Sequence, residues 1–385
     1  MNILQIHNFY IFKGGEDEVV LAEKQMLEQK GHNVISLTIH NEVMNSYFSK
    51  KKEFYEVLMN IIVSQKIDVA HIHNVYHIIG NNIYKTLATY NIPIVQTLHN
   101  FRFLCPSGLF LDNQNNVCER CINGNVTSCV LKKCYQKSYI KSLGMALLAN
   151  KGRKVVNNYV DEFIALNSFS KNKFVESGFK EENISVKSNF LKIEKKEFVN
   201  TYSYFLYVGR LSPEKGIETL IKAFAQSNLP LKIAGSGTEI YVEELKKLAK
   251  NNKNIEFIGF VSGQAKEKIF QNAISLIIPS NCYENFPISI LEAYGLRKPV
   301  ICSNIGGLPS IVKNGVTGLL FESGSSDSLL QAVNAITENN QFEVFGQNGY
   351  DYFLNNFTEE YNYQQLMAIY NSAIENREKK CKNTF

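Results

Sequence analysis

The sequence has little proline and no long hydrophobic run, and both absences limit what the chain can be. Its 385 residues include only 8 prolines, with 45% hydrophobic and 20% charged residues, a composition that excludes disordered, collagenous and disulfide-dense chains. No apolar stretch reaches the roughly 18 residues that a spanning helix needs, so any membrane contact is expected to be peripheral. A chain of this length divides more naturally into two domains than one.

The amino terminus lacks the features of a signal peptide. MNILQIHNFY has neither a basic start nor a small-residue cleavage site, and it runs directly into a strand-like pattern. We therefore expect a cytoplasmic protein, at the inner face of the cytoplasmic membrane if it contacts one. The net charge of +5 is mild and no nucleic-acid-binding module is recognisable, so no nucleic-acid partner is expected.

Short β-branched runs alternate with amphipathic helical patterns along the whole chain. The strand-like runs are MNILQIHN, NVISLTIH, DVAHIHN, PIVQTLHN and EFIALN in the first half, and YFLYVGRL, LKIAGSG, IEFIGFV, ISLIIPS and PVICSNIGG in the second. This βαβ spacing predicts an α/β protein with two parallel, doubly wound sheets. The sheets are separated by residues 188–204, which are polar and without helical or strand period.

Three parts are expected from this pattern. Residues 1–190 form a Rossmann-like domain with a cysteine-rich insertion at about 103–135, and residues 200–357 form a second Rossmann-like domain. Residues 358–385 contain a last helix, from about Thr358 to Arg377, that can cross back to the N-terminal domain.

Two glutamates eight positions apart follow the strand ISLIIPS. Ligands of such sheets bind outside the carboxyl ends of the strands. Pro287 suits the first turn of the next helix, which places Glu284 in the preceding loop and Glu292 in the second helical turn. Two carboxylates at that edge can accept hydrogen bonds from the hydroxyls of a sugar and a ribose. The alternative is a solvated helix face.

Two cations leave the same expected sheet edge. Arg210 and Lys215 flank a turn in YVGRLSPEKG, and such a pair fits a diphosphate better than a surface salt bridge. The next strand ends in AGSGTE, where Gly235 and Gly237 let the backbone approach a ligand closely.

The motifs GRLSPEKG, AGSGTE, FIGFVS and PSNCYENFPISILEAYGLRKPVICSNIGGLPSIV together resemble the retaining glycosyltransferases of family 4, within glycosyl transferases group 1. The resemblance covers nearly the whole chain and is densest from Tyr204 to Phe321. It implies the GT-B architecture, in which two Rossmann-like domains face a cleft, and a hexosyltransferase-type activity.

The resemblance also implies the roles of individual residues. Glu284 would contact the donor sugar, Glu292 the ribose, and Arg210 with Lys215 the diphosphate, while backbone amides near the start of the helix meet the sugar and phosphate. The implied donor-binding residues are Gly14, Gly15, Gly209, Arg210, Lys215, Gly235, Phe260, Val261, Glu284, Asn285, Phe286, Pro287, Ile288 and Glu292. The implied catalytic residues are Glu284, His99, Arg210 and Lys215.

The N-terminal half fits the same scheme. Gly14 and Gly15 in FKGGEDEVV can form a tight loop whose amides meet the donor phosphate or the acceptor, and the missing G-x-G-x-x-G pattern weakens an oxidoreductase interpretation. His99 ends a strand in TLHNFRFLCP, where the family often has a histidine beside the transferred sugar. Its alternative is a hydrogen-bonded structural imidazole. His71 and His73 are assigned to the strand DVAHIHN.

The implied chemistry is same-face substitution, in which the departing phosphate helps to deprotonate the acceptor hydroxyl. No side-chain base and no catalytic cofactor is then required, and the paired-Asp motif of metal-dependent transferases is absent. The expected donor is a nucleoside-diphosphate sugar, with UDP favoured. The expected acceptor is a glycan or an undecaprenyl-diphosphate-linked glycan of capsule, O-antigen or another bacterial surface polysaccharide. Alternatives are a nucleotide-sugar-binding protein without transfer, or a sugar-nucleotide epimerase or phosphorylase.

Five of the eight cysteines fall between residues 105 and 134. The pairs Cys118 with Cys121 and Cys129 with Cys134 have the spacing of zinc ligands, which predicts a structural zinc site beside the alternatives of free thiols or an oxidised pair.

The same region has no acidic residue from Arg120 to Val160. Tyr135, Tyr139, Leu143 and Leu147 recur there every fourth residue among lysines. Two interpretations stay open: a core stripe with a solvated basic face, or peripheral contact of residues 132–154 with anionic lipid or a lipid diphosphate.

Overall fold

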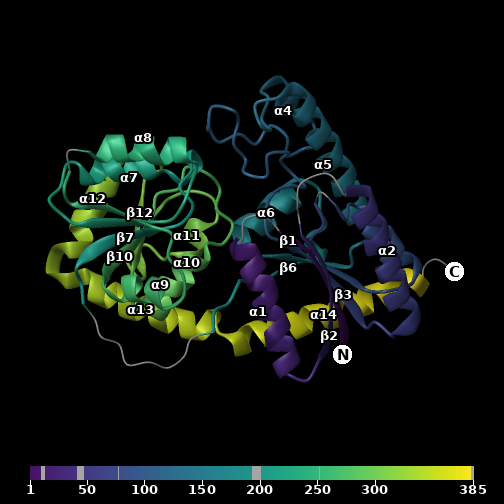
Figure 1. The fold of residues 1–385 in the computed structure, drawn as a ribbon. Coiled ribbons are helices and arrows are strands. Elements are labelled where there is room, and N and C mark those ends of the chain that lie inside the picture. The colour runs from purple at the N-terminus through teal and green to yellow at the C-terminus, as the bar shows by residue number, and fades with distance from the viewer. Residues whose placement is uncertain (10–13, 41–46, 77, 193–200, 251, 383–385) are drawn as a thin grey trace. The chain divides into compact units, whose positions relative to one another are not determined.

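The computed structural model describes residues 1–9, 14–40, 47–76, 78–192, 201–250 and 252–382 (Figure 1). The chain forms two compact units. The first consists of Met1–Leu109, Cys118–Asn189 and Glu359–Phe385, and the second of Phe110–Val117 and Phe190–Thr358. Each unit contains one sheet.

The first unit is built on a six-stranded sheet with the order β2-β1-β3-β4-β5-β6, in which all neighbouring strands are parallel. Its strands are β1 (Asn2–Phe9), β2 (Asn33–His40), β3 (Val69–Asn74), β4 (Ile94–Leu98), β5 (Glu162–Ala165) and β6 (Ile184–Val186). Every residue of β3, β4 and β5 is buried, as expected for central parallel strands that are covered on both faces.

The helices of the first unit are α1 (Gly15–Gln29), α2 (Tyr47–Ser64), α3 (Asn82–Thr89), α4 (Thr127–Leu131), α5 (Tyr139–Tyr159), α6 (Ser168–Glu176), the 3₁₀ turn η2 (Glu181–Asn183) and α14 (Glu359–Lys382). The last of these, α14, packs against β3, β4 and β5. Arg377 of α14 donates to Asp161 Oδ2 at 2.7 Å, and the same oxygen accepts from the backbone N–H of Ile94. The C-terminal helix is therefore an integral part of the first unit.

The second unit repeats the architecture with the strand order β12-β11-β10-β7-β8-β9, again with parallel neighbours. Its strands are β7 (Tyr204–Val208), β8 (Leu231–Ala234), β9 (Ile255–Gly259), β10 (Ala273–Ile278), β11 (Val300–Ser303) and β12 (Gly318–Phe321). Its helices are η3 (Pro213–Lys215), α7 (Ile217–Phe224), α8 (Glu239–Ala249), α9 (Gly263–Gln271), α10 (Ile288–Gly295), α11 (Leu308–Ile311), α12 (Ser326–Thr337), η4 (Glu338–Asn340) and α13 (Gln341–Asn356).

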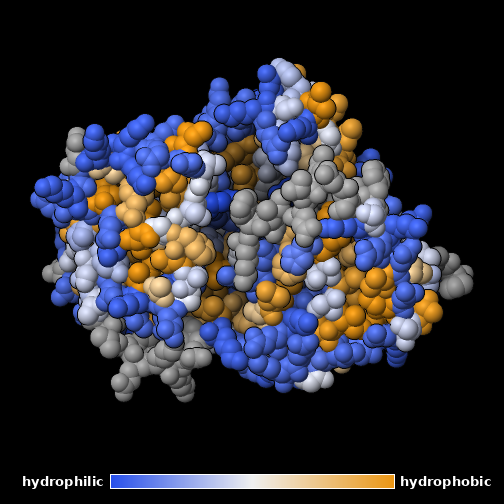
Figure 2. Space-filling view, viewed as in Figure 1, coloured by the Kyte–Doolittle hydropathy of each residue, from blue (hydrophilic) through white to orange (hydrophobic). Residues whose placement is uncertain are grey.

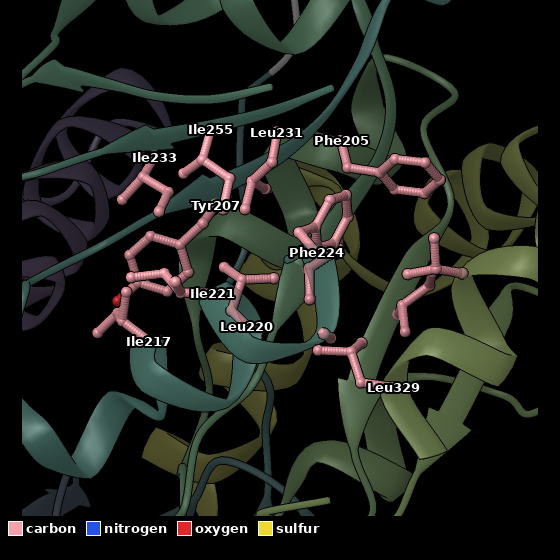
Figure 3. Packing of buried hydrophobic residues seen from close by; sticks show 14 of the residues in the cluster. Phe205, Tyr207, Ile217, Leu220, Ile221, Phe224, Leu231, Ile233, Ile255 and Leu329 are labelled. Atoms are coloured by element: carbon pink, nitrogen blue, oxygen red, sulfur yellow. The ribbon is translucent and has the colours of Figure 1, made fainter. Parts of the chain in front are cut away.

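Amphipathic helices cover this sheet. The surface over α8 is mostly hydrophilic (Figure 2), while the opposite face of α8 is buried. The core packs Ile217, Leu220 and Phe224 of α7 against Phe205 and Ile233 of the sheet (Figure 3). Burial of this apolar face holds α7 at a fixed position, and with it the loop that joins β7 to α7.

The predicted GT-B fold class, with two Rossmann-like sheets, is confirmed. The ten strand-like runs correspond to ten of the twelve strands described. The strands β6 and β12 were not predicted; they have only three and four residues and lie at sheet edges. Among the described residues no helix is both long and apolar enough to cross a membrane.

Candidate functional site

Lys215 and Glu284 form an ion pair at the carboxyl ends of β7 and β10, which are neighbours in the second sheet. Lys215 Nζ lies 2.5 Å from Glu284 Oε1, and Ser280 Oγ donates to the same oxygen at 2.6 Å. Both charged side chains are largely buried. The sequence predicts Lys215 and Glu284 at the carboxyl edge of the sheet, but it predicts neither their ion pair nor the hydrogen bond from Ser280.

Glycine geometry explains how residues 69 positions apart meet. Gly216 has a left-handed φ of 69°, and a Cβ there would lie 1.8 Å from the carbonyl oxygen of Pro279. The backbone N–H of Asn281 donates to the carbonyl of Glu214 at 2.9 Å. The β7–α7 loop is therefore in direct backbone contact with the loop after β10, and any larger residue at position 216 would separate them.

The ion pair sets the charge of Glu284. Burial alone would raise the pKa of this carboxyl, but Lys215, the hydrogen bond from Ser280 and Arg210 together lower it below 4.5. For Lys215 burial acts in the opposite direction and lowers the pKa. The negative charge of Glu284 outweighs this effect, so the pKa of Lys215 is raised above 10.5. Both groups are thus charged at neutral pH. Since an ammonium has three donors, Lys215 can bind a further anion while it holds Glu284.

Arg210 extends outward from the same loop. Its Nη2 lies 3.2 Å from Glu214 Oε1, which also accepts from Ser212 Oγ at 2.7 Å, and its side chain is otherwise exposed. Its backbone carbonyl accepts from the buried Tyr207 hydroxyl at 2.7 Å, which fixes the start of the loop. Because the Arg210 end of this pair is exposed to solvent, which weakens the interaction, an anion can compete with Glu214 for the guanidinium.

Close backbone contact also shapes the end of β8. Gly235 has a φ of 147°, and a Cβ there would lie 1.8 Å from the carbonyl oxygen of Gly209. Its N–H donates to the carbonyl of Gly259 at 2.8 Å. These glycines hold the strand ends of β7, β8 and β9 together. Phe260, which follows β9, leaves 75% of its side chain exposed, next to the partly exposed Val261.

Glu292 lies in the second turn of α10, as predicted. Its Oε1 accepts from Lys266 Nζ of α9 at 2.6 Å, a partner that the sequence analysis missed because Lys266 belongs to a different helix. The residues before the helix, Asn285 and Phe286, are buried, and Pro287 is the N-cap, one position before the first helical turn that was predicted for it. Ile288 is the first residue of α10.

The first unit contains the other predicted residues. Gly14 is the N-cap of α1 and Gly15 its first residue. The Gly14 N–H donates to Asp17 Oδ2 at 3.0 Å, and the other oxygen of Asp17 lies 2.8 Å from His7 Nε2. Apart from its neighbours in the chain and its own helix, no heavy atom of the described residues lies within 4 Å of where a Gly14 Cβ would be, so this part of the structure leaves room for a ligand at the Gly14 backbone. The preceding residues of FKGG, Phe12 and Lys13, lie outside the described residues.

His99 lines a small cavity at the carboxyl ends of β3 and β4, together with His73, Asn74, Tyr76 and Asn100. Its Nε2 lies 2.9 Å from His73 Nδ1, and the two rings stack with centroids 5.2 Å apart. His99 is therefore a hydrogen-bonded imidazole, the alternative considered for it, and it also borders a cavity.

Behind His99 lies a buried polar cluster that the sequence analysis missed. Glu23 of α1 pairs with Lys187 at 2.7 Å, and each side chain is only 1% exposed. Lys187 also donates to Asn362 of α14 at 3.1 Å. Glu23 Oε2 lies 3.4 Å from His73 Nε2. This Glu23–Lys187 cluster joins α1, the end of β6 and α14 around the predicted strand histidines.

Glu23, His71 and His73 place three possible metal-ligand atoms within 4.8 Å of one another. The arrangement fits hydrogen bonding better than a metal. Lys187 already neutralises Glu23, and His71 makes hydrogen bonds with both nitrogens, to Tyr370 at 2.9 Å and Thr97 at 2.8 Å. A cation at this position would face the Lys187 ammonium.

The buried histidines predict acid sensitivity. Burial lowers the pKa of His71 to about 4 and that of His73 and His99 well below 6.5. In the unfolded chain these imidazoles recover ordinary pKa values, so between pH 6.5 and about 4 the unfolded state binds more protons. The free energy of unfolding should therefore fall as the pH falls through this window. Urea unfolding at pH 7 and about pH 5 measures the effect, and a His71→Gln variant should lose part of this slope. If the free energy of unfolding were the same at both pH values, the histidines could not be neutral in the folded protein.

The arrangement in the second unit has the chemistry of an anion and polyol site. Lys215, Arg210 and backbone amides offer donors to a diphosphate, whereas Glu284 and Glu292 offer acceptors to hydroxyl groups. All four side chains lie at or just beyond the carboxyl ends of the sheet, where open α/β sheets bind ligands.

Comparisons with known proteins show what the chain is similar to. Residues 189–352 match the family model described as Glycosyl transferases group 1. An uncharacterized glycosyltransferase of Methanocaldococcus jannaschii is 27% identical over 334 residues, 84% of this chain and 80% of that protein. The capsular polysaccharide biosynthesis glycosyltransferase CapM of Staphylococcus aureus is 28% identical over 244 residues, 57% of this chain and 63% of that protein.

A solved structure supports the fold. The crystal structure of Anabaena HepE in complex with UDP and glucose superposes with a TM-score of 0.66 at 19% identity, and the match covers 95% of this chain and 98% of that one. The predicted enzyme class is confirmed: the chain is a glycosyltransferase whose residues 189–352 carry a glycosyl transferases group 1 domain on a GT-B fold, while its place in family 4 stays a prediction.

Proposed function

We propose that this glycosyltransferase moves a sugar, with retention of configuration, from a nucleoside-diphosphate sugar to a glycan or an undecaprenyl-diphosphate-linked glycan. UDP is the favoured nucleotide, and the product is a bacterial surface polysaccharide such as capsule or O-antigen. The observation that carries the proposal is the buried Lys215–Glu284 pair beside the exposed Arg210. The UDP and glucose of the HepE complex and the capsular assignment of CapM support the choice of donor and product.

The proposed mechanism uses the two cations for the leaving group. Cleavage of the bond between sugar and phosphate leaves negative charge on the diphosphate, which Lys215 and Arg210 stabilise. Glu284, held ionised by Lys215, accepts hydrogen bonds from sugar hydroxyls. The departing phosphate takes the proton of the acceptor hydroxyl as the new glycosidic bond forms on the same face. We also propose that His99 hydrogen-bonds the transferred sugar.

The stereochemical part of the proposal has a direct test. The product is formed from an α-linked UDP-sugar and a lipid-linked acceptor, and proton NMR then gives the configuration of the new bond. A retained α-linkage is expected. A β-linkage in the first-formed product would overturn the retaining mechanism and leave the transferase activity itself untouched.

Glu292 is proposed to hold the ribose of the donor. The Glu292→Ala variant should weaken donor binding by about 1.5–3 kcal/mol, since hydrogen bonds to a charged carboxylate are lost. The matched control is Glu243→Ala, which removes a glutamate of α8 that is paired with Lys246 at the surface. Isothermal titration with the donor measures both variants. Equal affinity of wild type and Glu292→Ala would remove Glu292 from the site.

A further inference from the structure

Exposed hydrophobic side chains gather on one side of α4 and α5. Ile140 is 84% exposed and Leu147 61% exposed. We define the α4–α5 apolar face by its six exposed members, Leu131, Tyr139, Ile140, Leu143, Leu147 and Leu148. In Figure 2, orange surface lies beside blue over the region that Figure 1 labels α4 and α5.

The buried side of α5 consists mainly of smaller residues. Its buried residues are Ser142, Met145, Ala146, Ala149, Gly152 and Val156. A Cβ at Gly152 would meet Asn81 at 3.1 Å and Phe103 at 3.4 Å, so α5 packs closely on its unit through this side. The stripe of Tyr139, Leu143 and Leu147 is therefore not part of the core, and the core interpretation of that stripe is wrong.

The surroundings of the apolar face are basic. The segment from Arg120 to Val160 contains no Asp or Glu, so none of its own side chains neutralises the lysines. The basic residues of α5 and its approach are Lys132, Lys133, Lys137, Lys141, Lys151, Arg153 and Lys154. Lys141 donates to the uncharged Gln136, and Lys133 Nζ lies 4.3 Å from the ring centroid of Tyr139. Hydrophobic and cationic groups thus share one helix surface.

We propose that the α4–α5 apolar face docks on an anionic lipid surface. The leucines and Ile140 would enter the boundary between headgroups and acyl chains, while lysines bind lipid phosphates. The positive charge of the face favours an anionic lipid surface as its partner, because a second copy of the chain would bring two basic faces together. A nucleic acid would leave the apolar side chains without a partner. Lipid docking depends on neither Lys215 nor Glu284, so it stands or falls separately from the proposed chemistry.

Vesicle binding tests the proposal with charge-matched variants. The test variant carries Ile140→Asp and Leu147→Asp. The control carries Val63→Asp and Ile240→Asp, at residues that are 78% and 77% exposed on α2 and α8. Wild type and control should bind phosphatidylcholine vesicles that contain phosphatidylglycerol, and high salt should weaken this binding. The test variant should bind about tenfold more weakly or worse.

Two outcomes would overturn the docking proposal. One is equal vesicle binding by the test and control variants, and the other is no preference of wild type for phosphatidylglycerol. If wild type and the control were dimers in solution and the test variant a monomer, the face would instead bind a second copy of the chain. Donor-induced thermal stabilisation of all variants, measured in parallel, shows that they are folded and reports on the donor site independently.

The cysteine-rich insertion brings five cysteines into one short segment of the first unit. Cys105, Cys121 and Cys129 are buried, Cys118 and Cys134 are partly exposed, and none is in a disulfide. The backbone N–H of Cys134 donates to the carbonyl of Cys129 at 3.0 Å, and the Cys121 thiol lies close enough to those of Cys105, Cys118 and Cys134 for electrostatic interaction. The five thiols thus occupy one neighbourhood of the first unit.

The part of the chain around these cysteines contains little regular secondary structure. Between β4 and α5 the five-residue α4 is the only helix described, and turns make up most of the rest. The structure assigns Zn²⁺ to this insertion as our second proposal, with Cys118, Cys121, Cys129 and Cys134 as thiolate ligands. No three of the sulfurs lie mutually within 4.8 Å among the described residues, so binding requires side-chain rotation. Each thiol that binds releases its proton to solvent.

Metal analysis tests the zinc site without reference to activity. Wild type grown with zinc should contain about one Zn²⁺ per chain by mass spectrometry. A Cys118→Ser and Cys121→Ser double variant should lose it, and the control Cys381→Ser, outside the insertion, should keep it. Equal zinc in all three proteins, or none in wild type, would overturn the site. A protein mass lower by two hydrogens would identify an oxidised pair instead.

Discussion

The Lys215→Met variant is expected to release nucleoside diphosphate from the donor about 10²–10³-fold more slowly than wild type. Lys215 both holds Glu284 in its charged form and offers an ammonium to the leaving diphosphate. Methionine keeps the length of the side chain but supplies neither interaction. Initial rates of nucleoside diphosphate release, measured at saturating donor, give the loss of transition-state stabilisation.

The matched control for this prediction is Lys222→Met, which replaces an exposed lysine of α7. It should retain wild-type rates, because Lys222 lies away from the carboxyl ends of the strands. Donor affinity of Lys215→Met should fall less than its rate, since the leaving diphosphate gains charge on cleavage. A Lys215→Met enzyme with the wild-type rate would mean that the pair is only structural.

The Glu23→Ala variant is expected to lower the free energy of unfolding by about 3–5 kcal/mol, the usual cost of leaving one charge of a buried pair alone. Lys187 is 1% exposed, and without Glu23 its ammonium would keep the hydrogen bond to Asn362 of α14 but would lose its counter-charge. Urea unfolding at neutral pH measures the loss. Because stabilities of this size approach the total for many domains, the variant is also expected to express poorly.

A double replacement separates the missing charge from lost packing. Glu23→Leu with Lys187→Met removes both charges and keeps apolar volume, so it should recover most of the stability of wild type. The exposed pair of Lys246 with Glu243 serves as a comparison, since Glu243→Ala there should cost no more than about 1 kcal/mol. A Glu23→Ala variant as stable as wild type would contradict the buried ion pair.

Much of the proposed donor site could be predicted from the positions at which the strands end. Parallel strands bring their carboxyl ends to one edge, so GRLSPEKG after β7 and the Glu284 loop after β10 could be placed together from the sequence. The direct pairing of Lys215 with Glu284 could not be predicted. It depends on β10 lying next to β7 in the sheet and on the contact of Gly216 with Pro279, which no local pattern encodes.

For the helix α5, the hydrophobic periodicity of the sequence does not predict which face is buried. An apolar stripe at every fourth residue ordinarily marks the core face of a helix, yet Leu143 and Leu147 face solvent and the smaller Ala146 and Ala149 are buried. Small residues allow close packing, so the buried side need not be the more hydrophobic one. Likewise Lys187, which is buried, has the sequence character of a surface residue, and its partner Glu23 is 164 positions away.

A donor panel distinguishes sugar transfer from binding of a nucleotide sugar without transfer. UDP-, GDP- and dTDP-sugars are compared by thermal shift and by nucleoside diphosphate release, for wild type and Glu284→Ala. We predict that one donor, with UDP favoured, stabilises wild type and is slowly hydrolysed by wild type alone. Stabilisation without release, even with lipid-linked acceptors present, would contradict sugar transfer and show a protein that binds a nucleotide sugar without transferring it.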